Sequence, residues 1–459
     1  MIQKNQNITL TIDALGSEGQ GIGRFEGMAV FVSGALPQET VEAHVIKVKK
    51  NYVVAKLETI MHASPDRVEP PCPVFGRCGG CALQHMNYAK QLDYKREWAA
   101  GTLERIGHIP NAAEKTRPVM GMEEPWRYRN KAAFPMAMDQ EGVLQFGFYA
   151  PRSHRLVPIE DCLLQEADMM AVMRAIRYWS WKWRVPAYQE AHHTGILRHV
   201  VIRKGNDGSG MMVIVVTHTP KLPYQVELMK QLNKTGVPIK GILHSVQPKP
   251  NNVILGEKMD ILSGENAVLE KIDGYTFTVS AQSFMQVNVR QTHILYQQAI
   301  DAANLTGNEV VVDAYCGIGT ISLLMARHAK HVYGVEMVEQ AVRDAQTNAK
   351  RNQCENVDFF AEAAEHFLPR WLQEGKTCDV LVLDPPRKGC DEKLLRAALD
   401  MRPERIVYVS CDVATLARDA RILTETGVYT FEFAQPVDMF AQTANLETVA
   451  LFQRTSPKA

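Results

Sequence analysis

The stretch Val310-Val-Val-Asp-Ala-Tyr-Cys-Gly-Ile-Gly319 reads as a buried strand that runs into a glycine-containing turn, with a helix expected from Thr320. Residues without a Cβ allow a nucleoside to approach the backbone at such a turn. No third glycine completes the pyrophosphate-binding pattern GxGxxG, so S-adenosylmethionine suits the turn better than a charged nucleotide. Glu336 ends the next expected strand, a position from which a carboxylate can hold ribose hydroxyls.

Around this stretch, the chain alternates helices and strands from about residue 285 onward. A helix is expected over 287–305. The expected strands are 310–313, 331–336, 357–360, 379–384, 405–410, 429–433 and 447–452. This alternation is typical of a doubly wound α/β sheet. The sequence therefore predicts a Rossmann-like domain of the class I methyltransferase type over residues 283–459.

Two strand ends in this domain carry chemically useful residues. Asp384-Pro-Pro-Arg387 follows one strand, and Cys411 follows the next. Arg387 stands where many amino-group methyltransferases have an aromatic residue, which argues against direct attack by an amine. A thiolate beside a methyl donor suits uracil, because its C5 carbon becomes nucleophilic only after a thiolate adds at C6. A buried structural thiol is the alternative for Cys411, but its polar setting favours a nucleophile.

The same reaction needs a base, because the C5 proton must leave before the thiolate can be eliminated. Glu447, at the start of the last expected strand, is the candidate. A solvated carboxylate at a strand start is the alternative interpretation.

The first sixty residues alternate apolar and polar side chains in short segments. The expected strands are 8–12, 29–32, 41–46 and 52–57, and the expected turns lie at Gly19, Gly21, Gly23 and 34–37. The pattern predicts a small five-stranded barrel over residues 1–60. Four lysines would then contact RNA phosphates, or else form only a solvated face: Lys47, Lys49, Lys50 and Lys56.

Four of the nine cysteines precede the α/β domain: Cys72, Cys78, Cys81 and Cys162. The segment Cys78-Gly-Gly-Cys81 places two thiolates on one tight turn, and four soft ligands suit either tetrahedral zinc or a [4Fe–4S] cluster. Local chemistry leaves both open, together with unligated buried thiols. The clustering nevertheless favours a metal site in this part of the chain.

Residues 61–282 are expected to form a mixed α+β central domain that carries these cysteines. A helix is predicted over 87–107, and strand-like segments include 145–149, 199–203 and 212–216. Tyr128-Arg-Asn-Lys131 and Leu197-Arg-His199 combine cations with rings that can stack on bases. That combination suits a surface that contacts single-stranded RNA.

The overall composition is that of a globular protein. Of 459 residues, 46% are apolar and 22% charged, and the formal net charge is +0. Residues 283–459 hold 18 Lys and Arg against 23 Asp and Glu, which leaves −5 there and +5 in the preceding part. A modestly basic front suits RNA contact. No run of about 18 apolar residues and no signal-like segment occurs, so the expectation is a cytoplasmic protein without a membrane partner.

Five ordered motifs resemble those of the RNA uracil-C5 methyltransferases of the TrmA/RumA group, which includes the RlmD- and RlmCD-like 23S rRNA (uracil-5-)-methyltransferases. The motifs lie at 283–288, 313–319, 384–389, 410–419 and 438–447. The N-terminal barrel, with its turns Gly-Gln-Gly-Ile-Gly23 and Val-Ser-Gly-Ala-Leu-Pro37, resembles the TRAM domain, an RNA-binding module. The resemblance thus runs from the barrel to the C-terminus.

This resemblance implies roles for individual residues. Cys411 would be the nucleophile and Glu447 the base. The donor site would be formed by Gln286, Tyr315, Glu336 and Asp384, and Asp384 would also face the uracil edge. The four cysteines match the [4Fe–4S] ligands of the RumA-like branch, which favours the cluster over zinc. Phe284 is placed to contact the target uracil, which must be flipped out of its stack to reach a thiol.

Three positions depart from the family pattern. Asp412-Val413 stands where Asn-Pro normally follows the nucleophile, Ala441 replaces a proline, and Asn445 replaces a histidine two residues before the base. The change at 412 is the most consequential, because a carboxylate next to Cys411 is expected to disfavour the thiolate.

The sequence therefore predicts S-adenosylmethionine-dependent methylation of uridine C5 in 23S rRNA, which forms 5-methyluridine through a covalent Cys–C6 adduct. Ribosomal RNA is preferred because the TRAM domain and the cysteine cluster accompany that branch of the family. One alternative is methylation of a tRNA uridine. Another is an RNA-binding module with a disabled methyltransferase fold. No obligate protein partner is implied.

Overall fold

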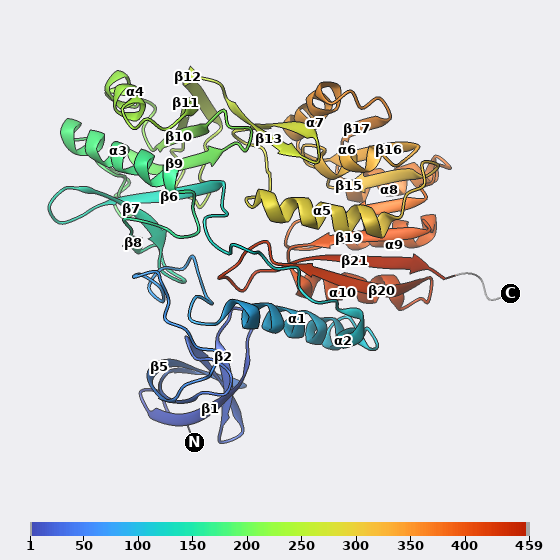
Figure 1. The fold of residues 1–459 in the computed structure, drawn as a ribbon, viewed down its shortest axis with the longest axis horizontal. Helices are drawn as coiled ribbons and strands as arrows, with labels where there is room; N and C mark the ends of the chain where they lie inside the picture. The colour runs from blue at the N-terminus through green and yellow to red at the C-terminus, as the bar shows by residue number, and fades with distance from the viewer. Residues whose placement is uncertain (1, 456–459) are drawn as a thin grey trace.

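The computed structural model describes residues 2–455 and begins with the expected barrel (Figure 1). Its strands are β1 (Asn7–Leu15), β2 (Gly21–Phe25), β3 (Met28–Ser33), β4 (Thr40–Val48) and β5 (Tyr52–His62), closed in the order β1-β2-β3-β5-β4. Alternate apolar residues such as Val30, Val41 and Val53 fill its interior. The prediction of a five-stranded barrel is confirmed.

The prediction of turns at Gly21 and Gly23 is wrong, because both residues lie inside β2. A Cβ at Gly23 would lie 2.2 Å from the carbonyl oxygen of Thr11, and one at Gly21 would lie 2.8 Å from that of Ala35. Glycine here permits close packing of the chain in a narrow barrel, rather than a turn. Gly19, with φ of +79°, does lie in the turn before β2.

The central part contains a seven-stranded mixed sheet in the order β12-β11-β10-β9-β6-β7-β8. Its strands are β6 (Lys131–Met138), β7 (Leu144–Tyr149), β8 (Leu156–Pro158), β9 (Leu197–Lys204), β10 (Met211–Thr217), β11 (Ile239–Val246) and β12 (Lys258–Gly264). Helices α3 (Ala167–Trp183) and α4 (Gln225–Asn233) pack on one face, where Met173 and Leu228 share a core with Val213 and Val215. The other face turns toward the α/β domain.

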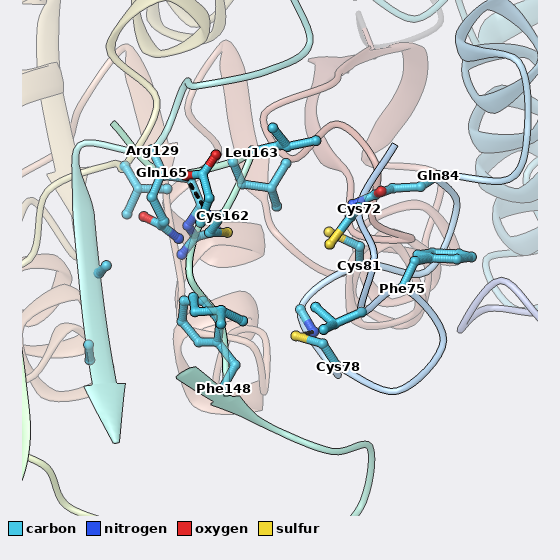
Figure 2. Close-up of a pocket in the computed structure, with 18 of the residues that line it drawn as sticks. Cys72, Phe75, Cys78, Cys81, Gln84, Arg129, Phe148, Cys162, Leu163 and Gln165 are labelled. Carbon is cyan, nitrogen blue, oxygen red and sulfur yellow. Dashed lines mark hydrogen bonds between the residues drawn. The ribbon is translucent and has the colours of Figure 1, made fainter. Parts of the chain in front are cut away.

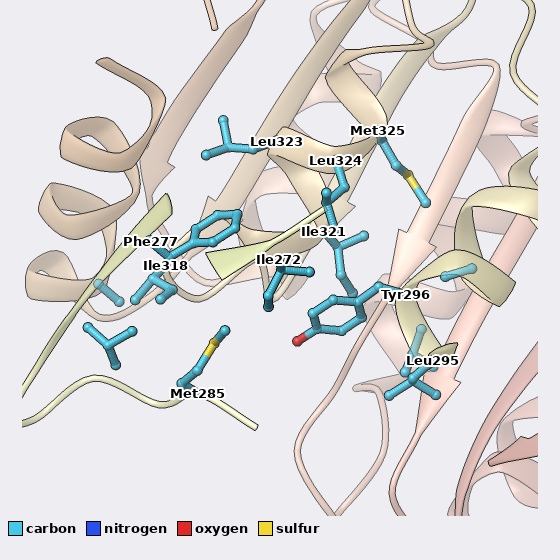
Figure 3. Close-up of a cluster of buried hydrophobic side chains, with 14 of the residues drawn as sticks. Ile272, Phe277, Met285, Leu295, Tyr296, Ile318, Ile321, Leu323, Leu324 and Met325 are labelled. Carbon is cyan, nitrogen blue, oxygen red and sulfur yellow. The ribbon is translucent and has the colours of Figure 1, made fainter. Parts of the chain in front are cut away.

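That second interface forms around the hairpin of β13 (Ala267–Ile272) and β14 (Tyr275–Ser280). Side chains of β10 that point away from α3, such as Met212 and Ile214, share a core with Phe277 of the hairpin. In Figure 3, Ile272 and Phe277 lie beside Ile321 of the α/β domain and Tyr296 of the adjoining helix. Alternation along β10 therefore joins two halves of the molecule through one continuous core.

The α/β domain has the expected doubly wound sheet, in the order β17-β16-β15-β18-β19-β21-β20. Its strands are β15 (Val310–Ala314), β16 (His331–Glu336), β17 (Val357–Ala361), β18 (Val380–Leu383), β19 (Arg405–Ser410), β20 (Tyr429–Val437) and β21 (Glu447–Arg454). The first five are parallel, and β21 is antiparallel to both β19 and β20. The helices are α5 (Val289–Ala303), α6 (Thr320–Ala326), α7 (Glu339–Arg351), α8 (Ala364–Gln373), α9 (Glu392–Met401) and α10 (Val413–Thr424). The predicted fold class is confirmed.

Helix α1 (Tyr88–Arg105) lies between the barrel and the α/β sheet and is followed by the short α2 (Ala112–Lys115) (Figure 1). Ala99 and Leu103 share a core with Leu416 and Ala417 of α10, although these segments are far apart in sequence. Among the described residues, no helix is both long and apolar enough to cross a membrane.

Candidate active site

The order of the parallel strands reverses between β15 and β18, and their carboxyl ends face a small cavity of about 40 Å³. Asp313 at the end of β15 and Asp384 just after β18 both line it. Phe284, Met285 and Tyr296 close it from the other side. Ligands of doubly wound sheets bind at this kind of strand-order reversal, so the sequence motifs meet where the topology predicts a site.

Two carboxyl groups, one buried on Asp313 and one half-buried on Asp384, give the cavity its electrostatic character. Burial raises the pKa of Asp384 to about 7, and the nearby Asp313 contributes to the increase. Burial likewise raises the pKa of Asp313 to about 7, although the hydroxyl of Ser322 opposes this by donating to its Oδ2 at 2.5 Å. Oδ1 of Asp313 is buried and has no hydrogen-bond partner in the described part of the chain. A cation bound in the cavity would therefore stabilise the ionised forms of these two carboxyl groups.

The glycine turn after β15 has an unusual backbone. Tyr315 adopts φ of +68°, which is uncommon for a residue with a side chain, and Gly317 and Gly319 have φ of +56° and +80°. A Cβ at Gly319 would lie 2.8 Å from the Phe359 ring, whereas one at Gly317 would meet open space. Glu336 fixes the turn, because its Oε2 accepts from the Gly317 amide at 3.2 Å and its Oε1 from Val338 at 2.8 Å.

The segment 281–288, between β14 and α5, brings the motif Ser283-Phe-Met-Gln-Val-Asn288 to the same region. Phe284 is 70% exposed at the mouth of the cavity, whereas Gln286 is buried and does not line it. The carboxylate of Asp344 on α7 accepts from the hydroxyls of Ser280 at 2.8 Å and Ser283 at 2.5 Å. These contacts hold the segment against the α/β sheet.

Cys411 follows β19 and is half-buried. Burial, Glu447 and Asp384 together raise the pKa of the Cys411 thiol to about 11, and Arg387 opposes them. Glu447 is buried at the start of β21, and burial together with Asp384 raises its pKa well above the usual value. The structure therefore brings Cys411, Glu447 and Asp384 within mutual electrostatic influence, whereas Glu336 lies on the glycine-turn side of the site.

Asp412 has a different role from the one that its position next to Cys411 indicates. Its Oδ1 accepts from the amides of Ala414 at 2.9 Å and Thr415 at 3.1 Å, so the carboxylate caps the N-terminus of α10. A helix N-terminus favours negative charge. Asp412 is accordingly the smallest of the influences that raise the pKa of Cys411, and the expected penalty on the thiolate is only partly realised.

The other two departures lie in the segment that leads into Glu447. Ala441 is buried, and its carbonyl oxygen accepts from the Tyr128 hydroxyl at 2.9 Å. Asn445 is exposed. The segment is fixed nearby by Asp438, whose Oδ1 lies 2.6 Å from the buried Nζ of Lys95 on α1. Tertiary contacts therefore hold the approach to Glu447 without the usual proline.

Two neighbours of the site, Tyr296 and Arg387, have no role assigned to them in the predicted set of site residues. Tyr296 lies in the cavity wall, where burial, followed by Asp384, Glu447 and Asp313, raises its pKa well above the usual value. Its position within an amphipathic helix made it indistinguishable from a core residue. Arg387 is the cation that opposes the elevated pKa values of both Cys411 and Glu447. It was visible only as part of Asp384-Pro-Pro-Arg387.

The four cysteines outside the α/β domain line a single cavity of about 420 Å³ between the segment 72–84 and the central sheet. In Figure 2, Cys72, Cys78 and Cys81 lie together on one side, and Cys162 faces them from the other. Burial raises the pKa of Cys81 to about 12 and shifts the pKa values of Cys78 and Cys162 upward. Among residues 2–455, no three His, Cys, Asp or Glu side chains form a ready-made site for a metal ion.

Comparison with known proteins identifies the family. The tRNA (Uracil-5-)-methyltransferase family matches residues 258–455, and the TRAM domain matches residues 3–57. A protein of Halalkalibacterium halodurans named as an uncharacterized RNA methyltransferase is 47% identical over 98% of both chains. A protein of the same name from Clostridium tetani is 42% identical over 98% of this chain and 97% of its own length.

A solved structure has the same fold over nearly the whole chain. It is the Pyrococcus abyssi tRNA (uracil-54, C5)-methyltransferase in complex with S-adenosyl-L-homocysteine, with a TM-score of 0.77 and 22% sequence identity. It covers 97% of this chain and 100% of its own. Together with the family matches and the relatives over 40% identical, the site places this chain in the family of S-adenosylmethionine-dependent RNA uracil-C5 methyltransferases.

Proposed function

We propose that this enzyme methylates C5 of a uridine in 23S rRNA, with Cys411 as the nucleophile and Glu447 as the base. The observation that carries the assignment of roles is the electrostatic coupling of Cys411, Glu447 and Asp384 at the ends of adjacent strands. A thiol and a buried carboxyl group that both interact with Asp384 in the wall of the donor cavity are the groups that addition at C6 and proton removal from C5 require.

Cys411 would act first: its half-buried thiol loses its proton to solvent, and Sγ adds as a thiolate to C6 of the flipped uracil and makes C5 nucleophilic. S-adenosylmethionine would supply an electrophilic methyl group on a sulfonium, which C5 would take as S-adenosylhomocysteine leaves. The ionised form of Glu447 would then accept the C5 proton. The electron pair of the C5–H bond restores the C5–C6 double bond while the bond from C6 to Cys411 breaks. The thiolate leaves and the product is 5-methyluridine.

The donor site is assigned to Gln286, Tyr315, Glu336 and Asp384. Glu336 would hold ribose hydroxyls, because it ends β16 beside the glycine turn. Asp384, in the cavity wall, would face the positively charged sulfonium and the uracil edge. The enclosed part of the cavity, about 40 Å³, receives only a portion of the donor. The rest would extend over Met337, which is 72% exposed next to Glu336.

We also propose that Cys72, Cys78, Cys81 and Cys162 hold a [4Fe–4S] cluster, with zinc as the alternative. The donor set fits, because four thiols from two distant segments face one cavity of about 420 Å³ with apolar walls that include Phe148 and Leu163. That volume leaves room for a cluster of several atoms. The cluster would join the segment 72–81 to the central sheet. Methyl transfer moves no net electrons, so a structural or RNA-contacting role is preferred.

The proposed division of labour follows three domains, at residues 1–60, 61–282 and 283–459. The barrel and the central domain would grip RNA, and the last domain would perform the chemistry. The exposed lysines of the barrel, Lys47, Lys49 and Lys50, support phosphate contact. Lys56 is also exposed but lies 3.0 Å from Glu58, which reduces its availability.

The preference for 23S rRNA rests on the combination of a TRAM domain with the cysteine cluster. Methylation of tRNA is the second candidate, favoured by the shared fold with an archaeal tRNA methyltransferase. The deciding experiment incubates the purified protein and S-adenosylmethionine with unmodified 23S rRNA and tRNA transcripts separately and measures 5-methyluridine by nucleoside mass spectrometry. Product in 23S rRNA alone supports the proposal. Product in tRNA alone contradicts it.

A further inference from the structure

A second cavity, of about 530 Å³, lies on the central sheet and shares no lining residue with the active-site cavity or the cysteine cavity. It forms where β6 and β7 end and β9 begins, and segments around residues 189 and 251 complete its wall. Strands β6 and β9 pair antiparallel, with Lys131 opposite Arg203 at one end and Pro135 opposite His199 at the other. The end of the pair that carries Lys131 and Arg203 faces the active site, because Arg203 donates to the carbonyl oxygen of Ser283 at 2.8 Å.

The wall of this cavity contains a stacked aromatic pair. The rings of Tyr149 and His154 are 5.2 Å apart and 17° from parallel. Tyr149 remains 36% exposed, which leaves part of its surface accessible from the cavity mouth. Stacking of a base on an aromatic ring is the common way in which proteins hold unpaired nucleotides.

The interior offers hydrogen-bonding groups rather than a purely apolar surface. His199 lines the cavity, and its Nδ1 is buried without a hydrogen-bond partner among residues 2–455. Burial and the adjacent Arg198 lower the pKa of His199 to about 4, so the ring is neutral at physiological pH. The amides of Asn251 and Asn252 lie on the same wall. A buried polar atom of this kind needs a partner that a ligand can provide.

The charges around the cavity select against a phosphate. Glu190 contributes a carboxylate and lies 2.9 Å from Nδ1 of His154. The cation in the wall, Arg198, is already occupied, because it donates to the carbonyl oxygens of Gln247 and Lys249, both at 2.7 Å. A neutral, flat ligand with hydrogen-bonding edges therefore fits the cavity better than an anion.

The location links this cavity to the surfaces that would hold RNA. Along β6 and β9, it lies about 14 Å from the active-site end, four residues away at roughly 3.4 Å per residue. The carbonyl oxygen of Tyr149 accepts from the amide of Gly79 in the cysteine segment at 2.9 Å. Arg152, in the following turn, lies 2.6 Å from Glu18 of the barrel. One RNA molecule can thus reach the barrel, this cavity and the active site together.

We propose that this cavity binds an unpaired nucleobase of the substrate RNA, which stacks on Tyr149 and hydrogen-bonds to His199. The base is distinct from the target uridine and anchors the RNA at a distance from the chemistry. This inference rests on the RNA methyltransferase activity and not on the choice between 23S rRNA and tRNA. The site would contribute to affinity and selection of the RNA, while leaving the reaction steps unaffected.

The test compares Tyr149→Ala with Tyr178→Ala, which removes an exposed tyrosine from α3 outside the cavity. The backbone contact of Tyr149 with Gly79 survives the substitution. We expect Tyr149→Ala to raise about 10-fold the KM for whichever full-length transcript the wild type methylates, as loss of one stacked base predicts. The value of kcat should stay unchanged. Adduct formation with a trinucleotide centred on 5-fluorouridine, which is too short to reach the cavity, should equal that of the wild type.

A second measurement keeps the inference independent of turnover. Ultraviolet irradiation of the wild-type complex with each transcript, followed by mass spectrometry, should place an RNA nucleotide on peptides that contain Tyr149 or Asn252. A KM for Tyr149→Ala equal to that of Tyr178→Ala, with crosslinks confined to other segments, overturns the site. Failure of the wild type to methylate 23S rRNA would instead overturn the proposed substrate, and crosslinking to either transcript would still test the cavity.

Discussion

Cys411 lies in surroundings that disfavour its own ionisation. Burial, Glu447 and Asp384 all raise its pKa, and Arg387 acts in the opposite direction. Its position before the N-terminus of α10 also favours the thiolate, because the helix dipole is positive there. Cys411, the proposed nucleophile, is therefore held as a thiol in the free enzyme. It would become reactive when the substrate and the cationic donor change the local charge.

The proposed roles of Cys411 and Glu447 predict opposite behaviour of two variants. Cys411→Ala should abolish methylation while RNA binding stays within about twofold, because the side chain is small and half-buried. Glu447→Gln should still add to C6 and transfer the methyl group, but it should fail to remove the C5 proton. A covalent protein–RNA species should accumulate and be visible on a denaturing gel.

The matched control for this experiment is the double variant, which lacks the thiol and should give no covalent species. If Glu447→Gln binds both RNA and donor but no covalent adduct accumulates, Glu447 is not the base that removes the C5 proton and so allows release of the product.

Binding of the donor should depend on pH through the two carboxyl groups of the cavity. Asp313 and Asp384 have pKa values raised to about 7, mainly by burial. A sulfonium cation stabilises their ionised forms, so affinity for S-adenosylmethionine should increase roughly 10-fold between about pH 6 and pH 8. Below pH 7 the binding should release protons. Calorimetry in two buffers with different ionisation enthalpies measures both effects.

Asp384→Asn provides the comparison, because it removes one titrating group and keeps a similar shape. We expect weaker binding with a flatter pH dependence. An affinity of the wild type that is constant over this pH range would show that neither carboxyl group faces the cation.

At the residue scale, the sequence predicts those residues of the candidate site that lie at the ends of strands. Cys411, Asp384 and Glu447 come from three segments, yet each is adjacent to a recognisable strand. Tyr296 differs, because its placement depends on how the hairpin and α5 pack against the sheet. Local patterns carry no information about that packing.

At the level of elements, α10 shows how one residue serves two structures. Its N-cap, Asp412, directly follows Cys411, and the Asp412 carboxylate accepts from two amides of the first turn. The choice between aspartate and asparagine at this position therefore changes the charge beside Cys411 without changing the cap, since both side chains cap helices well.

Two substitutions separate these effects. Asp412→Ala should lower the free energy of unfolding by roughly 1 kcal/mol through loss of the cap, as measured by chemical denaturation. Asp412→Asn should retain most of that stability and lower the pKa of Cys411, because one of the neighbouring negative charges is removed. The pH dependence of iodoacetamide labelling at Cys411 measures the pKa. Equal stability of the alanine and asparagine variants would contradict the capping role.

The incorrect prediction of turns in β2 has a physical cause. The strand β2 was interpreted as turns because its glycines serve contacts across the barrel, which arise only after closure. The α/β strands, by contrast, were predicted within a few residues, because buried parallel strands give continuous apolar runs. The pattern of apolar residues indicates which side chains of one element are buried. It does not report how closely two elements approach.

In the whole molecule, one connection between the barrel and the segment that follows it is a buried cluster around Glu39. Glu39, in the loop before β4, is buried, and its carboxylate lies 2.5 Å from Nε of Arg67, beyond β5. It also accepts from the amides of Leu36 at 2.8 Å and Ser64 at 3.3 Å. Burial acts to raise the pKa of Glu39, but the Arg67 and backbone contacts outweigh it, and the pKa is lowered.

This lowered pKa makes the attachment of the barrel sensitive to acid. A carboxyl group whose pKa falls on folding stabilises the folded state above its unfolded pKa of 4.5, and that contribution is lost as pH falls through the lower folded value. Glu39→Gln should remove it at all pH values and cost roughly 1.5–3 kcal/mol, the range for hydrogen bonds to charged groups. Hydrogen exchange should show faster opening of β4 and of the segment 64–67, with the α/β strands unchanged. A uniform loss of protection across the chain would mean that the barrel and the α/β domain unfold together, and that Glu39 stabilises the whole protein rather than the attachment of the barrel.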